Sequence, residues 1–321
     1  MILKPINGTW FEFRHHNTAE GVFWNDACEK FTDEQWEAKV DEIAALGMKY
    51  IVLMASSLVY EGGSHSYFDT DIYPLAPLAA KDPIGAIMRA AKRNNIKVFM
   101  SCGYYGEWSE PKVNMVDLGV QKRAFKAMER LVELYGDNSA FYGWYLPDET
   151  DINPYFSDLF IDYINRYAKF GRELLPASKV LIAPYGTNHL KADDKYISQL
   201  ERIDADFVAY QDEVGVEKAT YDETPRFYEA LRKAHDKAGR SALWADVELF
   251  EFTGKVYQSS LKSAPFERIE KQIQSVSPYV DEILVYQYQG MMNSPDSKAF
   301  CGHPDSLKLY NDYKKWLENI K

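Results

Sequence analysis

Helical and strand-like segments alternate along the whole chain, and this alternation restricts the fold more than any other feature. Apolar residues recur at three- and four-residue spacing in each predicted helix, and a short apolar run of strand type follows. With an opening strand at residues 7–13, the pattern predicts eight strands, each followed by a helix. The other strands are predicted at residues 50–58, 97–105, 141–150, 179–186, 206–215, 241–250 and 282–290. Strands separated by helices form parallel sheets, so residues 1–321 are predicted to form one α/β domain, a (β/α)8 TIM barrel.

Local signals mark the ends of several predicted helices. Thr32 with Gln35 forms a capping box before the first helix, and Gly47 ends that helix. Pro83 and Pro225 suit the first turn of two later helices. An open doubly wound sheet is the alternative architecture. It usually carries a glycine-rich phosphate turn after its first strand, and the segment FEFRHHNTAEG at residues 11–21 cannot serve as one.

Charge and cysteine content exclude several classes of function. The net charge of -11 disfavours an electrostatic grip on nucleic acid or anionic lipid. No apolar run is long enough to span a membrane, and the opening residues MILKPINGTW show no signal peptide. The three cysteines have no CxxC spacing, so buried free thiols are expected rather than a disulfide framework or a zinc site.

Acidic side chains lie at the ends of two predicted strands. The segment GWYLPDET at residues 143–150 begins as a buried strand and ends in Asp148 and Glu149. In SALWADVELF the aliphatic residues alternate with Trp244, Asp246 and Glu248. Side chains alternate along a strand, so these three are expected to point toward the barrel axis. Active sites of such barrels lie at the C-terminal ends of the strands, so Glu149 and Glu248 are predicted to converge on one cavity.

Other polar and aromatic residues follow the remaining strands. Flat apolar rings with hydrogen-bonding groups around them suit a sugar, and the chain has 23 Tyr and 7 Trp. Adjacent histidines on a strand point apart, so at most one of His15 and His16 is expected to reach a ligand. The predicted substrate-binding residues are Glu12, His15, Tyr104, Trp108, Asp148, Tyr185, Asn188, Gln211, Asp212, Trp244, Tyr286 and Gln287.

These strand ends resemble those of the large (β/α)8 clan of glycoside hydrolases. The segment LPDE matches the clan's acid/base segment, with Asp148 in place of its usual Asn, and WADVE matches the nucleophile segment. The resemblance implies that Glu149 is the acid/base and Glu248 the nucleophile, without a cofactor or metal. The chain also resembles a group of bacterial glycosidase-like barrels known only as domains of unknown function. Their frequent export implies a periplasmic or surface protein with a trimmed signal; a cytoplasmic protein is the alternative.

The resemblance implies a carbohydrate substrate, an oligo- or polysaccharide, cleaved by two carboxyl groups in a retaining reaction. Burial beside Trp144 and the charge of Asp148 are expected to raise the pKa of Glu149, as a general acid requires. Glu251 is the competitor for the nucleophile if the strand runs longer.

One alternative function is that of a metal-dependent sugar isomerase or epimerase, with Glu149, Asp212 and Asp246 or Glu248 holding Mg²⁺ or Mn²⁺. The other is a non-catalytic carbohydrate-binding barrel.

Overall fold

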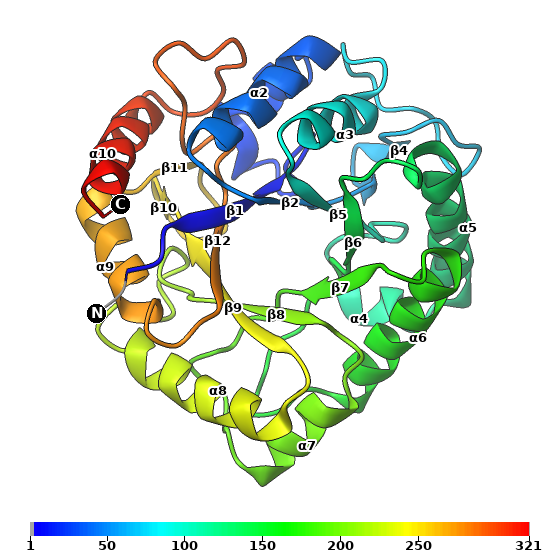
Figure 1. Ribbon diagram of the computed structural model, residues 1–321. Helices are drawn as coiled ribbons and strands as arrows, with labels where there is room; N and C mark the ends of the chain where they lie inside the picture. Colours follow the sequence, from blue (N-terminus) through cyan, green and yellow to red (C-terminus); the bar gives the residue numbers. More distant parts are fainter. Residues whose placement is uncertain (1–2, 321) are drawn as a thin grey trace.

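The computed structural model describes residues 3–320 and contains a closed barrel of eight parallel strands inside a ring of helices (Figure 1). Around the barrel the order is β1-β12-β9-β8-β7-β6-β5-β2, so each strand pairs with its neighbours in sequence and the last pairs with the first. The predicted TIM barrel is therefore confirmed. The strands are β1 (Ile6–Phe11), β2 (Tyr50–Leu53), β5 (Lys97–Ser101), β6 (Phe141–Tyr145), β7 (Lys179–Ile182), β8 (Phe207–Gln211), β9 (Ala242–Glu248) and β12 (Glu282–Tyr286).

One long helix follows each strand. These helices are α2 (Asp33–Ala45), α3 (Pro83–Arg93), α5 (Leu118–Tyr135), α6 (Asp158–Leu174), α7 (Asp194–Arg202), α8 (Thr224–Ala238), α9 (Phe266–Val276) and α10 (Asp305–Ile320). The predicted capping box of Thr32 and Gln35 is present at α2, and the Asp82 side chain caps α3 by accepting from Gly85 N–H. Side-chain oxygens at these positions satisfy backbone donors that have no partner within the helix, which explains why both helices begin there.

Smaller elements lie in the loops at the barrel rim. They are the turns η1 (Gly21–Phe23), α1 (Asn25–Cys28) and α4 (Pro111–Asn114), and two hairpins. β3 (Ser57–Tyr60) pairs with β4 (Gly63–Ser66), and β10 (Phe250–Phe252) pairs with β11 (Leu261–Ser263). Most predicted strands were too long at their C-terminal ends. The residues beyond each barrel strand leave the sheet and build these rim loops.

Aromatic side chains fill the N-terminal half of the barrel interior. Trp244 stacks on Phe207 with ring centroids 4.2 Å apart and also contacts Tyr50 and Phe99. Trp244 is 2% exposed and does not line the cavity at the other end of the barrel. The prediction that Trp244 lines the ligand cleft is therefore wrong. The ring does face the axis as predicted, but it lies near the start of β9, too deep to meet a ligand.

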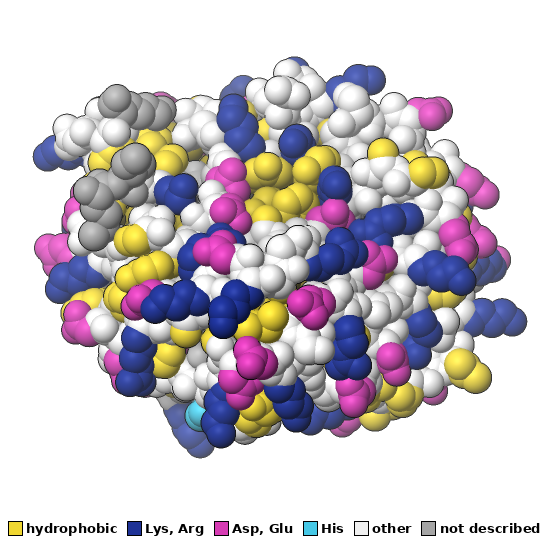
Figure 2. Space-filling view, turned by 60° about the horizontal axis from the view of Figure 1, so that its bottom comes forward, with side chains coloured by type: hydrophobic (Ala, Val, Ile, Leu, Met, Phe, Trp, Pro, Cys, Tyr) yellow, Lys and Arg dark blue, Asp and Glu magenta, His cyan; other side chains and the backbone are white. Residues whose placement is uncertain are grey.

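The surface shows no strong segregation of charge on the face seen in Figure 2, where basic and acidic side chains are interspersed and apolar ones gather in small areas. Within residues 3–320, no helix is both long and apolar enough to cross a membrane. Cys28, Cys102 and Cys301 are buried free thiols, as expected.

Candidate active site

A cavity of about 390 Å³ opens at the C-terminal ends of the barrel strands. Its walls combine residues near the C-terminal ends of all eight barrel strands and in the loops that follow them, so distant parts of the chain meet there. The structure brings together eight of the residues singled out from the sequence. They are His15, Tyr104, Trp108, Glu149, Tyr185, Gln211, Glu248 and Tyr286.

Glu149 lies half-buried in the cavity wall and is held by two donors. Tyr145 O–H donates to its Oε1 at 2.7 Å, and Gln211 Nε2 donates to its Oε2 at 2.7 Å. Burial raises the pKa of Glu149 to about 7, the two donors act in the opposite direction, and the charge of Asp148 adds a smaller upward effect. A carboxyl of this pKa exchanges a proton near neutral pH, as a general acid/base must.

Trp144 does not contribute to the cavity, contrary to expectation. Its ring points outward from the barrel, where Nε1 donates to Gly171 O of α6 at 3.3 Å. Gly171 is the residue that makes room for this ring, because a Cβ there would lie 2.6 Å from Trp144. The register of β5 and β6 shifts between Val98 and Phe99, so simple alternation from Tyr142 does not predict the side on which Trp144 lies.

Asp148 points away from the cavity although it precedes Glu149. Asn114 Nδ2 donates to its Oδ1 at 2.8 Å, and Tyr163 O–H donates to its Oδ2 at 3.3 Å. Burial raises the pKa of Asp148 to about 6, against the effect of these donors. Because Asn114 belongs to α4 and Tyr163 to α6, Asp148 ties the loop that carries Glu149 to the surrounding helices. This position does not support the predicted direct contact with substrate.

Glu248 is the last residue of β9 and is 3% exposed. Val216 N–H, in the loop after β8, donates to its Oε2 at 2.9 Å. Gly215 allows that approach, because a Cβ there would lie 2.9 Å from Glu248 Oε2. Burial and then the charge of Asp212 raise the pKa of Glu248 to about 8, while Val216 N–H and the Arg268 charge act in the opposite direction.

Asp212 lies behind Glu248 and does not line the cavity. Its Oδ1 accepts from the backbone N–H of Glu248 at 3.2 Å and of Val214 at 3.3 Å, and its Oδ2 accepts from Gln272 Nε2 at 2.7 Å. Arg268 of α9 donates to the Glu248 backbone oxygen at 2.9 Å. Asp212 and α9 thus position the end of β9. The competitor Glu251 pairs with Lys262 on the β10–β11 hairpin at 2.9 Å, outside the cavity lining.

Glu12 anchors a buried polar network at the end of β1. Trp24 Nε1 and Gln287 Nε2 donate to its Oε1 at 3.1 and 2.8 Å, and Tyr286 O–H donates to its Oε2 at 3.3 Å. Gln287 is fully buried, and neither Gln287 nor Glu12 lines the cavity. Tyr286 therefore connects this network to the cavity, and Glu12 orients the Tyr286 side chain.

His15 and His16 both line the cavity, so the prediction that at most one would do so is wrong. Their ring centroids are 4.5 Å apart, and His16 lies 4.5 Å from the Trp108 ring. The alternation argument fails because β1 ends at Phe11 and both histidines lie in the loop beyond it. Asn25 of α1 holds that loop by accepting from His15 N–H at 2.7 Å. Burial lowers the pKa of each histidine to about 3, so both are neutral.

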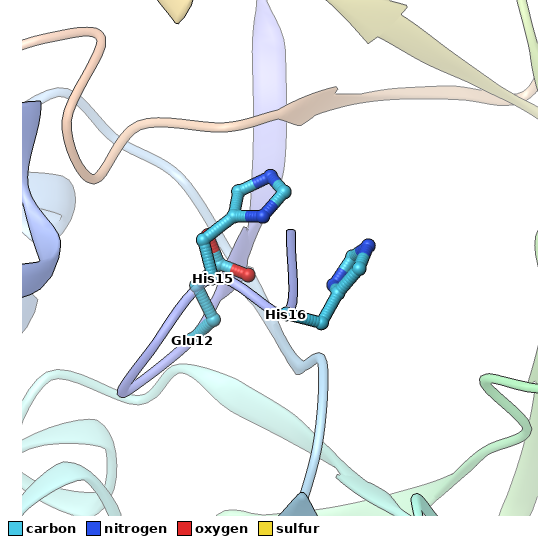
Figure 3. A group of neighbouring side chains, drawn as sticks. All are labelled: Glu12, His15 and His16. Atoms are coloured by element: carbon cyan, nitrogen blue, oxygen red, sulfur yellow. The ribbon is translucent and has the colours of Figure 1, made fainter. Parts of the chain in front are cut away.

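Metal-ligand spacing is found, within residues 3–320, at Glu12, His15 and His16 (Figure 3). The oxygen-rich set expected around Glu149 and Asp212 is not assembled in that part of the chain. Asn17 N–H donates to His15 Nδ1 at 3.0 Å, so in the neutral ring Nε2 carries the hydrogen and faces Glu20 at 3.5 Å. The Glu12 oxygens also accept hydrogen bonds from three side chains. The side chains of Glu12, His15 and His16 are therefore better suited to hydrogen bonding than to holding a metal.

Tyr185 forms part of the cavity wall with Lys218, whose Nζ lies 5.0 Å from the Tyr185 ring centroid. Lys218 Nζ also lies 3.6 Å from Glu213 Oε1. Asn188 is not in the lining; its Nδ2 donates to the Lys218 backbone oxygen at 3.0 Å and so supports this loop.

Sequence analysis missed several residues of the cavity lining. They include Trp10, Glu20, Met54, Val216, Lys218, Phe250 and Tyr257, and Asp246 was considered only as a metal ligand. Most of them lie in loops, where no periodic pattern predicts which side chains turn inward. Asp246 is different, because its place on the same face of β9 as Glu248 was a usable signal.

Carboxyl groups, amides and aromatic rings thus line a cavity at the C-terminal ends of the strands of a (β/α)8 barrel, where active sites of this fold lie. The chain belongs to the family described as a domain of unknown function, DUF4434, whose model matches residues 6–299. A comparison with curated protein sequences finds no match.

Several solved structures have a similar fold. A putative alpha-L-fucosidase from Bacteroides thetaiotaomicron has a TM-score of 0.78 at 16% identity, covering 100% of this chain and 95% of the other. The endo-1,4-beta-mannanase from Rhizomucor miehei has a TM-score of 0.61 at 9% identity, covering 98% and 95%. The endo-beta-1,4-mannanase from Thermotoga petrophila has a TM-score of 0.57 at 10% identity, covering 99% and 77%. At these identities the likeness shows the fold.

Proposed function

We propose that this protein is a glycoside hydrolase that cleaves an oligo- or polysaccharide with Glu149 as acid/base and Glu248 as nucleophile. The observation that carries the proposal is that both carboxyl groups line one cavity from β6 and β9, each with its own hydrogen-bond donors. Glycosidic cleavage needs such a pair, one to protonate the leaving oxygen and one to attack or stabilise the anomeric carbon.

The proposed reaction has two steps. Glu149 donates its proton to the glycosidic oxygen while the Glu248 carboxylate bonds to the anomeric carbon, and the alcohol leaves. Glu149, now ionised, takes a proton from water, the water oxygen bonds to the anomeric carbon, and Glu248 leaves as a carboxylate. Val216 N–H and the positive charge of Arg268 favour the ionised form of Glu248, but burial and the charge of Asp212 outweigh them and raise its pKa to about 8, so the attacking carboxylate forms mainly at alkaline pH.

Aromatic and amide groups around the pair supply sugar binding. Trp108 and Tyr185 present half-buried rings, and the buried Tyr104 and the half-buried Tyr286 also line the cavity. Rings of this kind pack against the C–H faces of a sugar, while hydroxyl and amide groups reach its edges. The fucosidase, mannanase, galactosidase and glucuronidase descriptions of similar folds are consistent with a sugar substrate and do not select one.

Turnover of a panel of aryl glycosides and oligosaccharides tests the proposal, with EDTA present to separate it from metal-dependent chemistry. Glu248→Ala should abolish turnover, and azide should restore part of it as a glycosyl azide of inverted configuration. Glu149→Ala should slow substrates with poor leaving groups far more than activated aryl glycosides, because the latter need no proton. Glu251→Ala, outside the cavity, is the matched control.

Wild-type turnover by folded Glu248→Ala would refute the assignment, as would binding of sugars without any turnover. The stereochemistry is tested by a structure with bound sugar. Carboxyl groups about 5 to 5.5 Å apart indicate retention, and a separation of roughly 6.5 to 9.5 Å indicates inversion.

A further inference from the structure

Another acid, Asp246, lines the cavity together with the proposed catalytic pair. It is two residues before Glu248 on the same face of β9, it is 4% exposed, and it lines the cavity. Its Oδ1 has no hydrogen-bond partner in the part of the chain that the structure describes. The other buried acids near the site differ, because Glu12 and Asp212 each accept from three groups and Asp148 from two.

An ionised carboxylate is expensive at such a position. Burial disfavours the charged form, because the neutral acid loses much less hydration, and the backbone N–H of Tyr286 opposes this effect only weakly. The groups that face Asp246 make ionisation still less favourable, because they are Glu248 on the same strand, Glu149 after β6 and Asp212 after β8. Arg268, whose charge acts on Glu248 and Asp212, donates to the backbone oxygens of Glu248 and Phe250 and to Gln272 Oε1. Burial and then these charges raise the pKa of Asp246 well above its ordinary value.

We propose that Asp246 holds a proton and acts as an uncharged hydrogen-bond donor to a hydroxyl oxygen of the sugar bound between Glu149 and Glu248. The inference rests on the proposed function and adds a residue that selects the substrate. A protonated carboxyl offers one O–H donor, whereas Glu248 must be ionised to attack and can then only accept. Glu248 would thus accept the hydrogen of a sugar hydroxyl group, while Asp246 donates a hydrogen bond to its oxygen.

Infrared difference spectroscopy tests directly whether the Asp246 carboxyl group is protonated, and it needs no substrate. At pH 8 the wild-type spectrum should contain a protonated-carboxyl C=O band that disappears in Asp246→Asn. Glu251→Gln is the matched control, because Glu251 pairs with Lys262 outside the cavity, and its loss should remove no such band at pH 8. An unchanged carboxyl band in Asp246→Asn would overturn the proposal.

Steady-state kinetics test whether Asp246 donates a hydrogen bond to the substrate. Asp246→Asn keeps the shape and an N–H donor, so kcat/KM should stay within about threefold of wild type, whereas Asp246→Ala should lose about tenfold, the worth of one neutral hydrogen bond. An Asn variant as poor as the Ala variant would mean that a carboxylate is needed, and a fully active Ala variant would mean that the donor is not used. Both results contradict the inference. If wild type turns over no glycoside, the proposed function fails, while the infrared band still decides the protonation of Asp246.

Discussion

Gln211 and Glu149 join the end of β8 to the loop after β6, across the intervening β7, through one hydrogen bond. Gln211 Nε2, at the end of β8, donates to Glu149 Oε2 at 2.7 Å and also to the Ala183 backbone oxygen at 3.0 Å. The amide is therefore held by the loop after β7 while it orients the proposed acid/base after β6. Donors of this kind stabilise the ionised form and fix the direction of the proton.

Removal of this donor should change the pH dependence of catalysis. In Gln211→Ala the pKa of Glu149 should rise further, so the acid keeps its proton to higher pH and the alkaline limb of kcat/KM moves upward. We expect kcat at the optimum to fall about three- to tenfold because the carboxyl is less well oriented. The pH profile with an activated and an unactivated aryl glycoside measures both effects. Gln274→Ala, an exposed amide on α9, is the control, and an alkaline limb that moves downward would contradict the prediction.

Glu248 should destabilise the fold at alkaline pH. Its pKa is raised to about 8 in the folded protein, above the ordinary value of 4.5, so the folded state binds more protons than the unfolded state between these values. Stability should therefore fall as pH rises through this window. Glu248→Gln removes the charge, and we expect its melting temperature to exceed that of wild type by about 2 to 5 °C at pH 8. The difference should shrink toward pH 5; a gain that is equal at both pH values would contradict the assignment.

Trp108 and Trp244 should differ in what their loss affects. Trp108 is half-buried in the cavity wall, so Trp108→Ala should weaken sugar binding about tenfold with little change in melting temperature. Trp244 is packed among Tyr50, Phe99 and Phe207, and Trp244→Ala should cost about 3 to 5 kcal/mol of stability. Calorimetric titration and thermal unfolding of both variants check this. A large loss of stability in Trp108→Ala would place that ring in the core.

Gly215 should be required for the position of Glu248, because it has no side chain beside that carboxyl group. A Cβ there would lie 2.9 Å from both Cβ and Oε2 of Glu248, so Gly215→Ala should displace the nucleophile or Val216 N–H. We expect kcat to fall about tenfold or more while the protein stays folded. Gly254→Ala in the exposed β10–β11 hairpin loop is the control, because its Cβ would meet only Ser259 at 3.3 Å. Unchanged kcat in Gly215→Ala would show that Glu248 can move without loss.

Periodicity in the sequence was enough to predict the barrel and the placement of Glu149 and Glu248 at one end of it. Helices with capping signals such as Thr32 and Gln35 alternate with apolar strands, and eight parallel strands of this length close on themselves. The alternation along β9 placed Asp246 and Glu248 on the axis side, and the end of β6 placed Glu149 at the same rim. These inferences hold because they depend on local geometry that every strand shares.

Tertiary structure alone decided how deep each side chain lies and where each loop turns. Trp244 faces the axis like Glu248, but only its contacts with Phe207 and Tyr50 show that it lies below the cavity. Alternation gives the side of a strand and not the level within the barrel. In the same way, Asn25 turns the loop that carries both histidines into the cavity, and Asn114 turns Asp148 out of it. Such directions come from hydrogen bonds between segments far apart in the chain, which no short stretch of sequence contains.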